Sequence, residues 1–408
     1  MPATVVIGGG AAGIAAARRL HDAGEDVLLV EAHSRLGGRA RSVAIGSPAA
    51  IVDVGCGWLH SAARNPWTGI AEAQGIAIDR SPPSWDVQWR DLGYPPREQQ
   101  VFGAAWDRWE ASARAALDGA DRPLSDFVAA DDPGRPLIDA ISGFVNGAPL
   151  DAVSLHDWAA YEDAAGEDNW ALPGGYGTLI VSHAAGLPIR LDTPVTRIDR
   201  RDRLLRLDTP AGTIEAGRAI VCVPTTVLAT EALVFDPPLP DKHTSAAALP
   251  LGLADKVFLA VNGPEWPADA HLIGNPRSAC TASHRLSPFG RPIIESFFGG
   301  RCAEQLERAD AAAFAIDELV ALLGSGWRRR LSPLAVTRWR QEPWIGGSYS
   351  HARVGRASER NALAAPVDER LHFAGEACHA SDFSTAHGAY ETGIAAADAV
   401  LALRPAPL

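Results

Sequence analysis

The sequence predicts an α/β fold, in which a Rossmann-type domain is combined with a discontinuous α+β domain. Three observations predict this fold. A glycine-rich turn follows an apolar run at the start of the chain, a second short apolar run lies near its end, and a long mixture of helical and strand-like segments separates them. Because a parallel sheet is built through crossover connections, the two distant apolar runs are expected to share one sheet.

The first thirty residues predict a strand, a glycine turn, a helix and a second strand. Thr4–Ile7 is apolar and β-branched, which is typical of a buried strand, and Val27–Val30 is the next strand. Between them, Gly8, Gly10 and Gly13 give the G-x-G-x-x-G spacing. The first glycine allows a tight turn, the second lets a pyrophosphate approach the backbone, and the third lets the next helix pack on the strand.

Glu31 narrows the choice of nucleotide. It ends the second strand, 18 residues after Gly13, where a carboxylate is expected to accept hydrogen bonds from an adenosine ribose. A carboxylate there would repel a ribose 2′-phosphate, so the nucleotide is NAD or FAD rather than NADP. The following run, Arg35-Leu36-Gly37-Gly38-Arg39, favours FAD, because it could wrap a second face of the pyrophosphate with Arg39 as a bidentate partner. The alternative interpretation of this run is a basic surface turn.

Composition limits the class of protein. The 408 residues are enough for two domains with cores of their own, and 47% hydrophobic with 21% charged residues is ordinary for a globular chain. The formal net charge of −12 argues against a nucleic-acid partner and is compatible with a cationic substrate, although an acidic surface also serves solubility. No apolar run approaches the roughly 20 residues that span a bilayer, so no membrane partner is expected.

The cysteines and the start of the chain predict a cytoplasmic location. The five cysteines show neither C-x-x-C nor zinc spacing, and their odd number fits a reducing compartment better than a disulfide framework. The chain enters a strand at residue 4, which leaves no room for a signal peptide.

Local patterns predict the remaining elements. Helices are expected at 11–23, 66–74, across most of 98–170, at 311–323 and at 386–403, where Ser384 and Thr385 would begin the last helix. Short strands are expected at 189–191 and 195–198, and the segments 204–207, 212–215 and 219–223 are expected to form a small β-meander. Further strands are expected at 51–54, 256–261, 293–298, 336–339 and 371–374. The last of these would join the sheet that residues 4–7 begin.

These elements divide the chain into two discontinuous domains. Residues 1–80, 171–235 and 351–408 are expected to bind the nucleotide. Residues 81–170 and 236–350 are expected to form the substrate-binding domain, with the proline-rich run at 235–240 as a crossing between the two.

A series of motifs occurs in order along the chain. They are the glycine turn with Glu31, residues 35–41, Asp53–His60 with Asn65-Pro66, Gly174-Gly175-Tyr176, Val221–Pro224, Lys256, Trp344–Ser350, Phe373–Glu376 and His387-Gly388-Ala389-Tyr390. Together they resemble the flavin-containing amine oxidases, a family that includes monoamine oxidases, polyamine oxidases and histone demethylases of that fold. The resemblance covers nearly the whole chain. It is poorest over residues 80–170, which shape the substrate cavity in the family, so the substrate stays open.

The resemblance implies FAD as the cofactor and assigns residues to its nucleotide half. Glu31 would hold the adenosine ribose, Arg39 would lie along the pyrophosphate, and Val195 would meet the adenine through its backbone. The opening turn would contribute Gly8, Gly10, Ala12 and Gly13.

The flavin half is assigned in the same way. Gly55, Gly57 and Trp58 would line the flavin ring, and Gly375 with Glu376 would hold the ribityl–pyrophosphate region. The last helix, which begins at Ala386, would face the N1/C2=O edge of the flavin. Reduced flavin carries negative charge at this edge, and a helix N-terminus stabilises such charge.

The resemblance also implies five catalytic residues, which are Lys256, Tyr349, Trp344, His60 and Thr385. Lys256 would hold a water against flavin N5, with an exposed strand lysine as the alternative. The chain has two lysines against 35 arginines, and arginine cannot replace a compact donor to one water, which favours the functional role. Tyr349 matches one of the two tyrosines that flank the substrate in monoamine oxidases, whereas Thr385 stands at the other place. The aromatic wall is therefore half-built unless Trp344 completes it. His60 is either a substrate contact or a structural histidine.

One departure from the family concerns flavin attachment. Monoamine oxidases attach the flavin through a cysteine in the segment that matches Gly346–Ser350, and Ser348 holds that place here. A serine cannot form the thioether, so the FAD is expected to be non-covalent.

The implied reaction is the FAD-dependent oxidation of a small-molecule amine to an imine, which water hydrolyses to an aldehyde or ketone, with O2 reduced to H2O2. The sequence shows no Ser-His-Asp, paired-carboxylate or metal constellation, which fits a reaction without a side-chain base. Two alternatives stay open: a flavin-dependent desaturase or oxidase of a non-amine substrate on the same fold, and a non-catalytic FAD-binding module. The sequence is also compatible with a homodimer.

Overall fold

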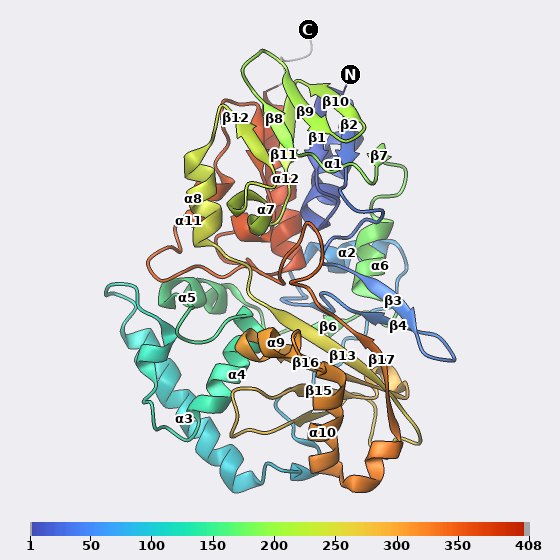
Figure 1. Cartoon of the computed structure of the whole chain (residues 1–408), viewed down its shortest axis with the longest axis vertical. Helices are drawn as coiled ribbons and strands as arrows, with labels where there is room; N and C mark the ends of the chain where they lie inside the picture. Colours follow the sequence, from blue (N-terminus) through green and yellow to red (C-terminus); the bar gives the residue numbers. More distant parts are fainter. Residues whose placement is uncertain (1, 404–408) are drawn as a thin grey trace.

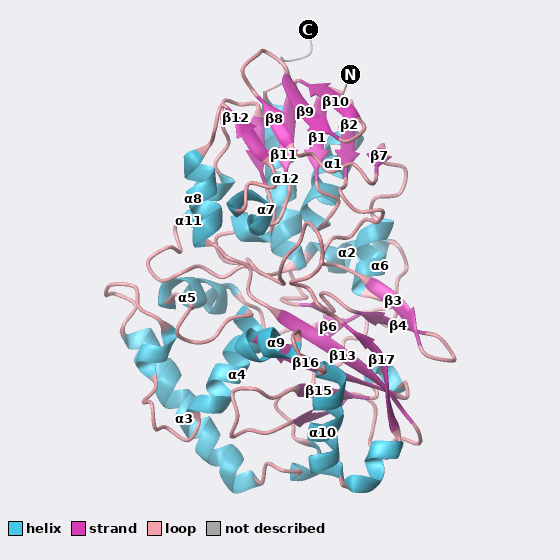
Figure 2. Ribbon diagram, in the orientation of Figure 1, coloured by secondary structure: helices cyan, strands magenta, loops and turns pink. Residues whose placement is uncertain are grey.

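The computed structural model describes residues 2–403. The chain forms two lobes, one built on a parallel sheet and the other on an antiparallel sheet (Figure 1). Helices lie against the sheets in both lobes (Figure 2).

The parallel sheet has five strands. Their order is β18 (Leu371–Phe373), β11 (Arg218–Val221), β1 (Thr4–Ile7), β2 (Val27–Val30) and β7 (Ile189–Arg190). All neighbouring pairs in this sheet are parallel. The prediction that the segment 371–374 joins the sheet begun by residues 4–7 is therefore confirmed, with β11 between the two strands.

Two long helices pack against each other beside this sheet. They are α1 (Ala11–Asp22), which follows the glycine turn, and α12 (Ala386–Ala402) (Figure 1). They meet at backbone distance, because a Cβ placed at Gly393 in α12 would lie 2.2 Å from the carbonyl oxygen of Ala12 in α1. Segments from opposite ends of the sequence therefore form one unit.

A four-stranded sheet lies in the same lobe. It contains β10 (Gly212–Ala216), β9 (Leu205–Thr209), β8 (Arg197–Asp199) and β12 (Val234–Asp236). The prediction that 219–223 belongs to this meander is wrong, because that segment forms β11 of the parallel sheet, whereas the short strand predicted at 189–191 is present as β7. The segment 219–223 is short, and nothing in its local pattern shows which strand it pairs with.

The second lobe is built on five antiparallel strands. Their order is β14 (Ala270–Ile273), β15 (Ser283–Leu286), β16 (Ile293–Gly299), β13 (Ala254–Val261) and β17 (Leu331–Val336). The predicted strand at 336–339 is wrong, because β17 ends where that segment begins. β17 is an edge strand, and an edge tolerates Pro333, which has no N–H to give to a ladder. Helices α9 (Gly300–Leu306) and α10 (Ala311–Leu323) pack on this sheet.

Helices supply most of the region 98–170, as predicted. They are α3 (Pro96–Ala115), α4 (Arg135–Asn146) and α5 (Leu155–Ala164), the last capped by Ser154. The remaining helices are α2 (Pro66–Ala73), α6 (Tyr176–Ser182), α7 (Thr225–Ala229), α8 (Pro240–Ala248) and α11 (Glu359–Ala364). Two small strand pairs complete the fold: β3 (Ser42–Ile45) with β4 (Ala50–Asp53), and β5 (Trp58–Leu59) with β6 (Trp170–Ala171).

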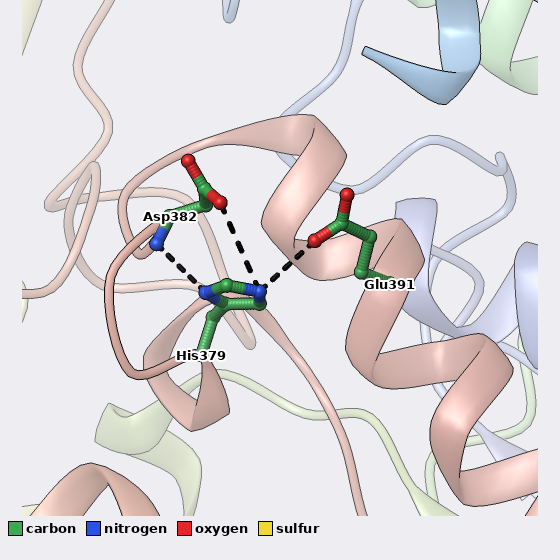
Figure 3. A group of neighbouring side chains, drawn as sticks. All are labelled: His379, Asp382 and Glu391. Carbon is green, nitrogen blue, oxygen red and sulfur yellow. Dashed lines mark hydrogen bonds and ion pairs between the residues drawn. The ribbon is translucent and has the colours of Figure 1, made fainter. Parts of the chain in front are cut away.

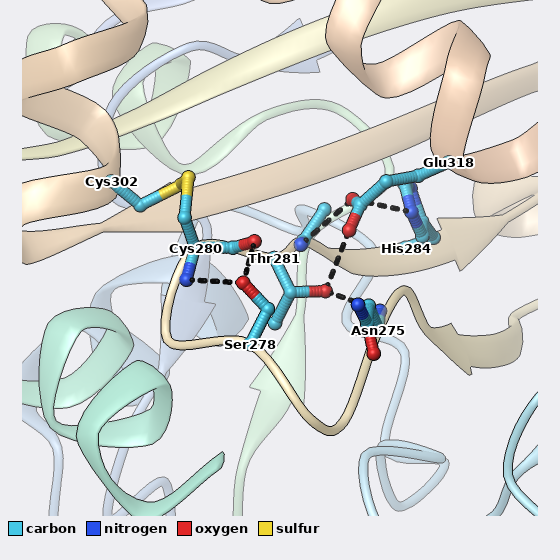
Figure 4. The surroundings of a disulfide bond; sticks show 8 residues. Asn275, Ser278, Cys280, Thr281, His284, Cys302 and Glu318 are labelled. Atoms are coloured by element: carbon cyan, nitrogen blue, oxygen red, sulfur yellow. Dashed lines mark hydrogen bonds and ion pairs between the residues drawn. A yellow bond between two sulfur atoms is a disulfide. The ribbon is translucent and has the colours of Figure 1, made fainter. Parts of the chain in front are cut away.

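A disulfide bond joins Cys280, in the β14–β15 connection, to Cys302 in α9 (Figure 4). The expectation of unpaired cysteines is therefore wrong for this pair, although the other three are free. The two Cα atoms are 4.6 Å apart, although the cysteines are separated by 22 residues in the sequence. This distance depends on how the chain folds between them, so no local sequence pattern predicts it. Glu318 fixes the same connection, because it accepts a hydrogen bond from the Thr281 hydroxyl at 2.7 Å and another from the Ala282 N–H at 3.0 Å.

Among residues 2–403, no helix combines the length and the apolar character that crossing a bilayer requires.

A buried ion pair joins the helical region to the first lobe. Arg360 in α11 is 1% exposed, and its guanidinium binds the two carboxylate oxygens of Asp157 in α5 at 2.7 and 2.8 Å. Asp157 also accepts the backbone N–H of Ala352 at 2.8 Å, and Arg360 donates to the Ser350 hydroxyl at 2.9 Å. Because a buried charge without a partner is costly, this pair holds α5 against α11.

Asp157→Ala is expected to lower the free energy of unfolding by about 3–5 kcal/mol, because it leaves the Arg360 guanidinium buried without its counter-charge. Urea unfolding followed by circular dichroism measures the change. Asp163→Ala is the matched control on the same helix, since Asp163 pairs with Arg114 at an exposed position and its loss should cost less than about 1 kcal/mol. Equal losses in the two variants would contradict the assignment.

Candidate active site

A cavity of about 1060 Å³ is lined by residues of both lobes. All the predicted site residues lie in its wall except Gly13. The volume exceeds the roughly 300–1,000 Å³ that is usual for a single small-molecule pocket, so a dinucleotide and a substrate could share it.

The glycine turn at one end of the cavity leaves no room for side chains. Gly8 has a φ of +104°, and a Cβ there would lie 2.6 Å from the carbonyl oxygen of Cys222 in the neighbouring segment. A Cβ at Gly13 would lie 1.8 Å from the carbonyl oxygen of Gly8, so Gly13 packs α1 against the turn instead of lining the cavity. The N-cap residue of α1, Gly10, has no side chain to cap the first N–H groups of the helix, which leaves them available for a phosphate.

Glu31 is buried and braces the same turn. Its carboxylate accepts the backbone N–H of Gly9 at 2.6 Å and that of His33 at 2.8 Å. Burial raises the pKa of the Glu31 carboxyl, but the hydrogen bonds from His33 and Gly9 outweigh it and hold the pKa below its ordinary value. The group is therefore an anion at neutral pH, placed in the cavity wall beside the turn.

Arg39 and Glu376 form an ion pair in the cavity wall. The guanidinium of Arg39 donates to Glu376 at 2.8 Å and to the carbonyl oxygen of Ser348 at 2.7 Å. Glu376 also accepts the hydroxyl of Ser350 at 2.6 Å. Burial raises the pKa of the Glu376 carboxyl, but Arg39 and Ser350 pull it below the ordinary value. The Glu376 carboxyl is thus an anion at neutral pH, and both side chains are held in place within the protein.

Lys256 is 7% exposed, which rules out the alternative of an exposed strand lysine. Its ammonium donates to the carbonyl oxygen of Asp53 at 2.9 Å and lies 2.7 Å from a carboxylate oxygen of Glu295. Lys256 lines the cavity on β13, and Glu295 lines it on the neighbouring strand β16.

Aromatic rings surround the cavity near His60. The ring centroid of Trp85 lies 4.9 Å from that of Trp58 and 6.2 Å from that of His60. His60 Nδ1 is 2.7 Å from the side-chain oxygen of Asn169, and burial lowers the pKa of the imidazole. His60 therefore lines the cavity and also makes a hydrogen bond within the protein, and its contact with substrate stays a prediction.

Trp85 belongs to the surface segment 81–88, and hydrogen bonds of Gln88 fix the C-terminal end of this segment. The side chain of Gln88 accepts the backbone N–H of Ile273 in β14 at 2.9 Å and donates to the carbonyl oxygen of Leu92 at 3.0 Å. Residues 81–86 line the cavity between this anchor and Asp79, whose backbone pairs with Ala171.

The other three predicted catalytic residues have different surroundings. The Tyr349 hydroxyl donates to the carbonyl oxygen of Phe144, and burial raises the pKa of the phenol. Trp344 is 36% exposed, and no ring contact joins it to Tyr349 among residues 2–403. The Thr385 hydroxyl accepts the N–H of Gly388 at 2.9 Å and thereby caps α12, so its visible role is to begin that helix at the cavity wall.

A cluster of His379, Asp382 and Glu391 precedes and flanks the start of α12 (Figure 3). His379 Nδ1 accepts the backbone N–H of Asp382 at 2.7 Å, so Nε2 carries the proton and donates to Glu391 at 3.0 Å. Asp382 binds the guanidinium of Arg64, and His387 Nε2 lies 3.1 Å from it. The imidazole nitrogens are thus used within the protein, and the cluster fixes the loop that leads into α12.

A model of the flavin-containing amine oxidoreductases matches residues 109–401, and a model of NAD(P)-binding Rossmann-like domains matches residues 6–71. The chain belongs to the flavin-containing amine oxidoreductase family. The resemblance expected from the motifs is therefore confirmed.

Relatives of this amine oxidoreductase include plant polyamine oxidases. It is 31% identical to polyamine oxidase 4 of Oryza sativa subsp. japonica, over 97% of this chain and 88% of the relative. It is 29% identical to polyamine oxidase 2 of Arabidopsis thaliana, over 97% and 87%. Among solved structures, a putrescine oxidase bound to putrescine has the same fold, with a TM-score of 0.79 at 19% identity, covering 98% of this chain and 99% of that one.

The protein is an oxidoreductase that uses FAD to oxidise an amine, acting on CH–NH or CH–NH2 groups. The residues in the structure fit FAD. The turn offers uncapped helix N–H groups without side chains in the way, a carboxylate lies beside it, and the cavity continues from there to Gly57 and Lys256. This amine oxidoreductase therefore has a continuous space for both halves of the cofactor.

Sequence reasoning missed several residues of the site. Glu295, Trp85, Asn169 and Glu162 line the cavity but carry no motif. Glu295 lies on the predicted strand 293–298, and its approach to Lys256 requires the register between β13 and β16, in which Lys256 is opposite Phe297. No local signal gives that register.

Glu31→Gln is expected to weaken FAD binding by roughly ten- to a hundredfold, because hydrogen bonds to a charged acceptor are stronger than those to a neutral one and two backbone amides of the turn lose that acceptor. Titration of the apoprotein with FAD, followed by flavin fluorescence, measures the dissociation constant. Glu72→Gln, which alters an exposed ion pair with Arg80, is the control and should leave it unchanged. Equal affinities for wild type and Glu31→Gln would show that the carboxylate is not needed.

Proposed function

We propose that this amine oxidoreductase oxidises a small aliphatic diamine or polyamine with non-covalently bound FAD, and that O2 takes the electrons and becomes H2O2. The observation that carries the proposal is the composition of the cavity wall. Aromatic side chains and Lys256 line the same space as Glu162, whose carboxylate makes no hydrogen bond or ion pair within residues 2–403 and is attracted by Arg114 only through longer-range charge. A second ammonium group of the substrate would supply the missing partner. The polyamine oxidases among its relatives support the same class of substrate.

The residues of the cavity would prepare the amine for oxidation. An amine must lose its proton before it can give up a hydride, and an apolar aromatic environment lowers its pKa by desolvation. Trp58, Trp85 and Phe297 supply that environment in this chain. Bound FAD supplies the acceptor for the hydride equivalent from the α-carbon. No side-chain base is then required.

The same proposal assigns the polar residues. Glu31 would hold the adenosine ribose, Arg39 and Glu376 would lie along the pyrophosphate and ribityl chain, and Lys256 would hold a water at the reacting face of the flavin. The N-terminus of α12, which Thr385 caps, would stabilise negative charge on the flavin. Residues 1–80, 171–235 and 351–408 would bind FAD, and residues 81–170 and 236–350 would bind substrate. The cytoplasmic location and the homodimer stay predictions from the sequence.

Anaerobic mixing with amines tests the substrate class. The flavin absorbance near its visible maximum is expected to bleach with putrescine, spermidine or spermine faster than with benzylamine, cyclic amines or amino acids. Oxygen readmission should restore the colour with release of H2O2. Bleaching by none of these amines would favour a non-amine substrate on the same fold, and preference for benzylamine would contradict the role of Glu162.

The surroundings of Ser348 support non-covalent attachment. Its hydroxyl donates to the carbonyl oxygen of Ala254 at 2.8 Å and accepts the N–H of the same residue at 2.8 Å. Ser348, which stands where monoamine oxidases have the cysteine that binds the flavin, thus makes both of these hydrogen bonds to the backbone of β13. Cys56 also lines the cavity, but burial raises the pKa of its thiol to about 12, so it is not a thiolate at neutral pH.

Denaturation of the yellow protein is expected to release all of its FAD, because neither group offers a nucleophile to the flavin ring. Intact-mass spectrometry of the denatured chain should give the mass of the polypeptide alone. A Ser348→Cys variant serves as the comparison, since it restores the side chain used by monoamine oxidases. A gain of one FAD in the wild-type mass would contradict the proposal.

A further inference from the structure

The two lysines of the chain are held in different ways. Lys242 donates to the carbonyl oxygens of Ala362 at 2.7 Å and Leu363 at 2.8 Å, and also to that of Ala365. Three carbonyl acceptors use all three of its N–H groups. Lys256 has one carbonyl acceptor, the Asp53 oxygen at 2.9 Å, and one carboxylate, Glu295 at 2.7 Å.

The Asp53 carboxylate makes no hydrogen bond to Lys256. Its carboxylate accepts the hydroxyl of Ser42 and the backbone N–H groups of Tyr176 and Gly177, the last two at 2.9 and 3.1 Å. Asp53 therefore accepts a hydrogen bond from Lys256 through its carbonyl oxygen, and its carboxylate adds only a longer-range charge attraction. Glu295 is the one carboxylate in an ion pair with Lys256 within the described chain, and the side chain of Glu295 makes no other ion pair or hydrogen bond there.

These two contacts leave the third N–H of Lys256 without a hydrogen-bond acceptor among residues 2–403, and the residue lines the cavity. A Cβ placed at Gly57 would lie 3.4 Å from the lysine nitrogen, so glycine at this position leaves the ammonium uncovered on that side. The ring of Phe297 lies below it, with its centroid 5.9 Å from the nitrogen. The side chains of Lys256 and Glu295 are 9% and 15% exposed, so solvent screens the pair weakly.

We propose that Glu295 is the positioning residue for Lys256: it fixes the direction of the ammonium at the cavity wall and cancels its charge as seen by the flavin. The proposal rests on the proposed place of Lys256 beside the flavin. It deepens that function, because it makes the electron affinity of the flavin depend on a pair of charges rather than on the lysine alone.

Charge arithmetic gives the direction of the effects. Glu295→Gln keeps the shape and an acceptor oxygen but leaves Lys256 as a net positive charge beside the flavin. Lys256→Met with Glu295 retained leaves a net negative charge instead. A weakly screened unit charge a few ångströms away changes the affinity for an anionic adduct by about tenfold or more.

Sulfite binding to the FAD-loaded protein tests this independently of any amine. Sulfite is an anion whose binding bleaches the flavin, so its dissociation constant reports the local potential. Glu295→Gln is expected to tighten sulfite binding by about tenfold or more, and Lys256→Met to weaken it by a similar factor. Glu265→Gln is the matched control, because it makes the same substitution in an exposed ion pair with Arg330 and should change nothing. An unchanged sulfite constant in Glu295→Gln would overturn the charge cancellation.

Anaerobic reduction by putrescine tests the positioning. Glu295→Gln is expected to slow the limiting rate of flavin reduction severalfold with little change in the half-saturating amine concentration. The Glu295→Gln substitution should cause no further slowing of flavin reduction when it is added to the Lys256→Met variant. An equal effect in both backgrounds would overturn the positioning role. Wild-type protein that holds FAD but is bleached by no amine defeats the proposed substrate class alone, because the sulfite measurement still decides the role of Glu295.

Discussion

The close packing of α1 is the constraint on which the rest of the structure depends. A Cβ at Gly13 would lie 1.8 Å from the Gly8 carbonyl, and one at Gly393 would lie 2.2 Å from the Ala12 carbonyl. The helix is therefore held at backbone distance by the turn on one side and by α12 on the other. This double contact brings the beginnings of two helices to one cavity, although they start 375 residues apart at Ala11 and Ala386. Both helix starts can then serve the same anionic cofactor.

Local signals predicted the parts of the molecule that depend on neighbouring residues. The opening strand–turn–helix unit, Glu31 and the capping role of Thr385 follow from short patterns, and the structure has them in the predicted places. Lys256 was singled out by the scarcity of lysine and by resemblance, and it is buried in the cavity wall. These residues need no knowledge of how distant segments meet.

Features that depend on distant pairing could not be predicted in the same way. The sequence places the segment of β11 in the wrong sheet, because a short buried strand does not encode its neighbour. The Cys280–Cys302 bond and the approach of Glu295 to Lys256 likewise require the register and path of separate elements. The roles of the site residues depend on chemistry at the bound cofactor. Neither the sequence pattern nor the packing of the chain assigns these roles by itself.

The segment that carries Trp85 is fixed to the sheet through Gln88 and meets the cavity mainly through ring contacts. Its sequence is therefore freer to change than the backbone contacts around α1, where even one methyl group has no room. Substitutions of a few side chains in this segment could change which amine is accepted, while the packing around α1 and the cofactor site stays the same.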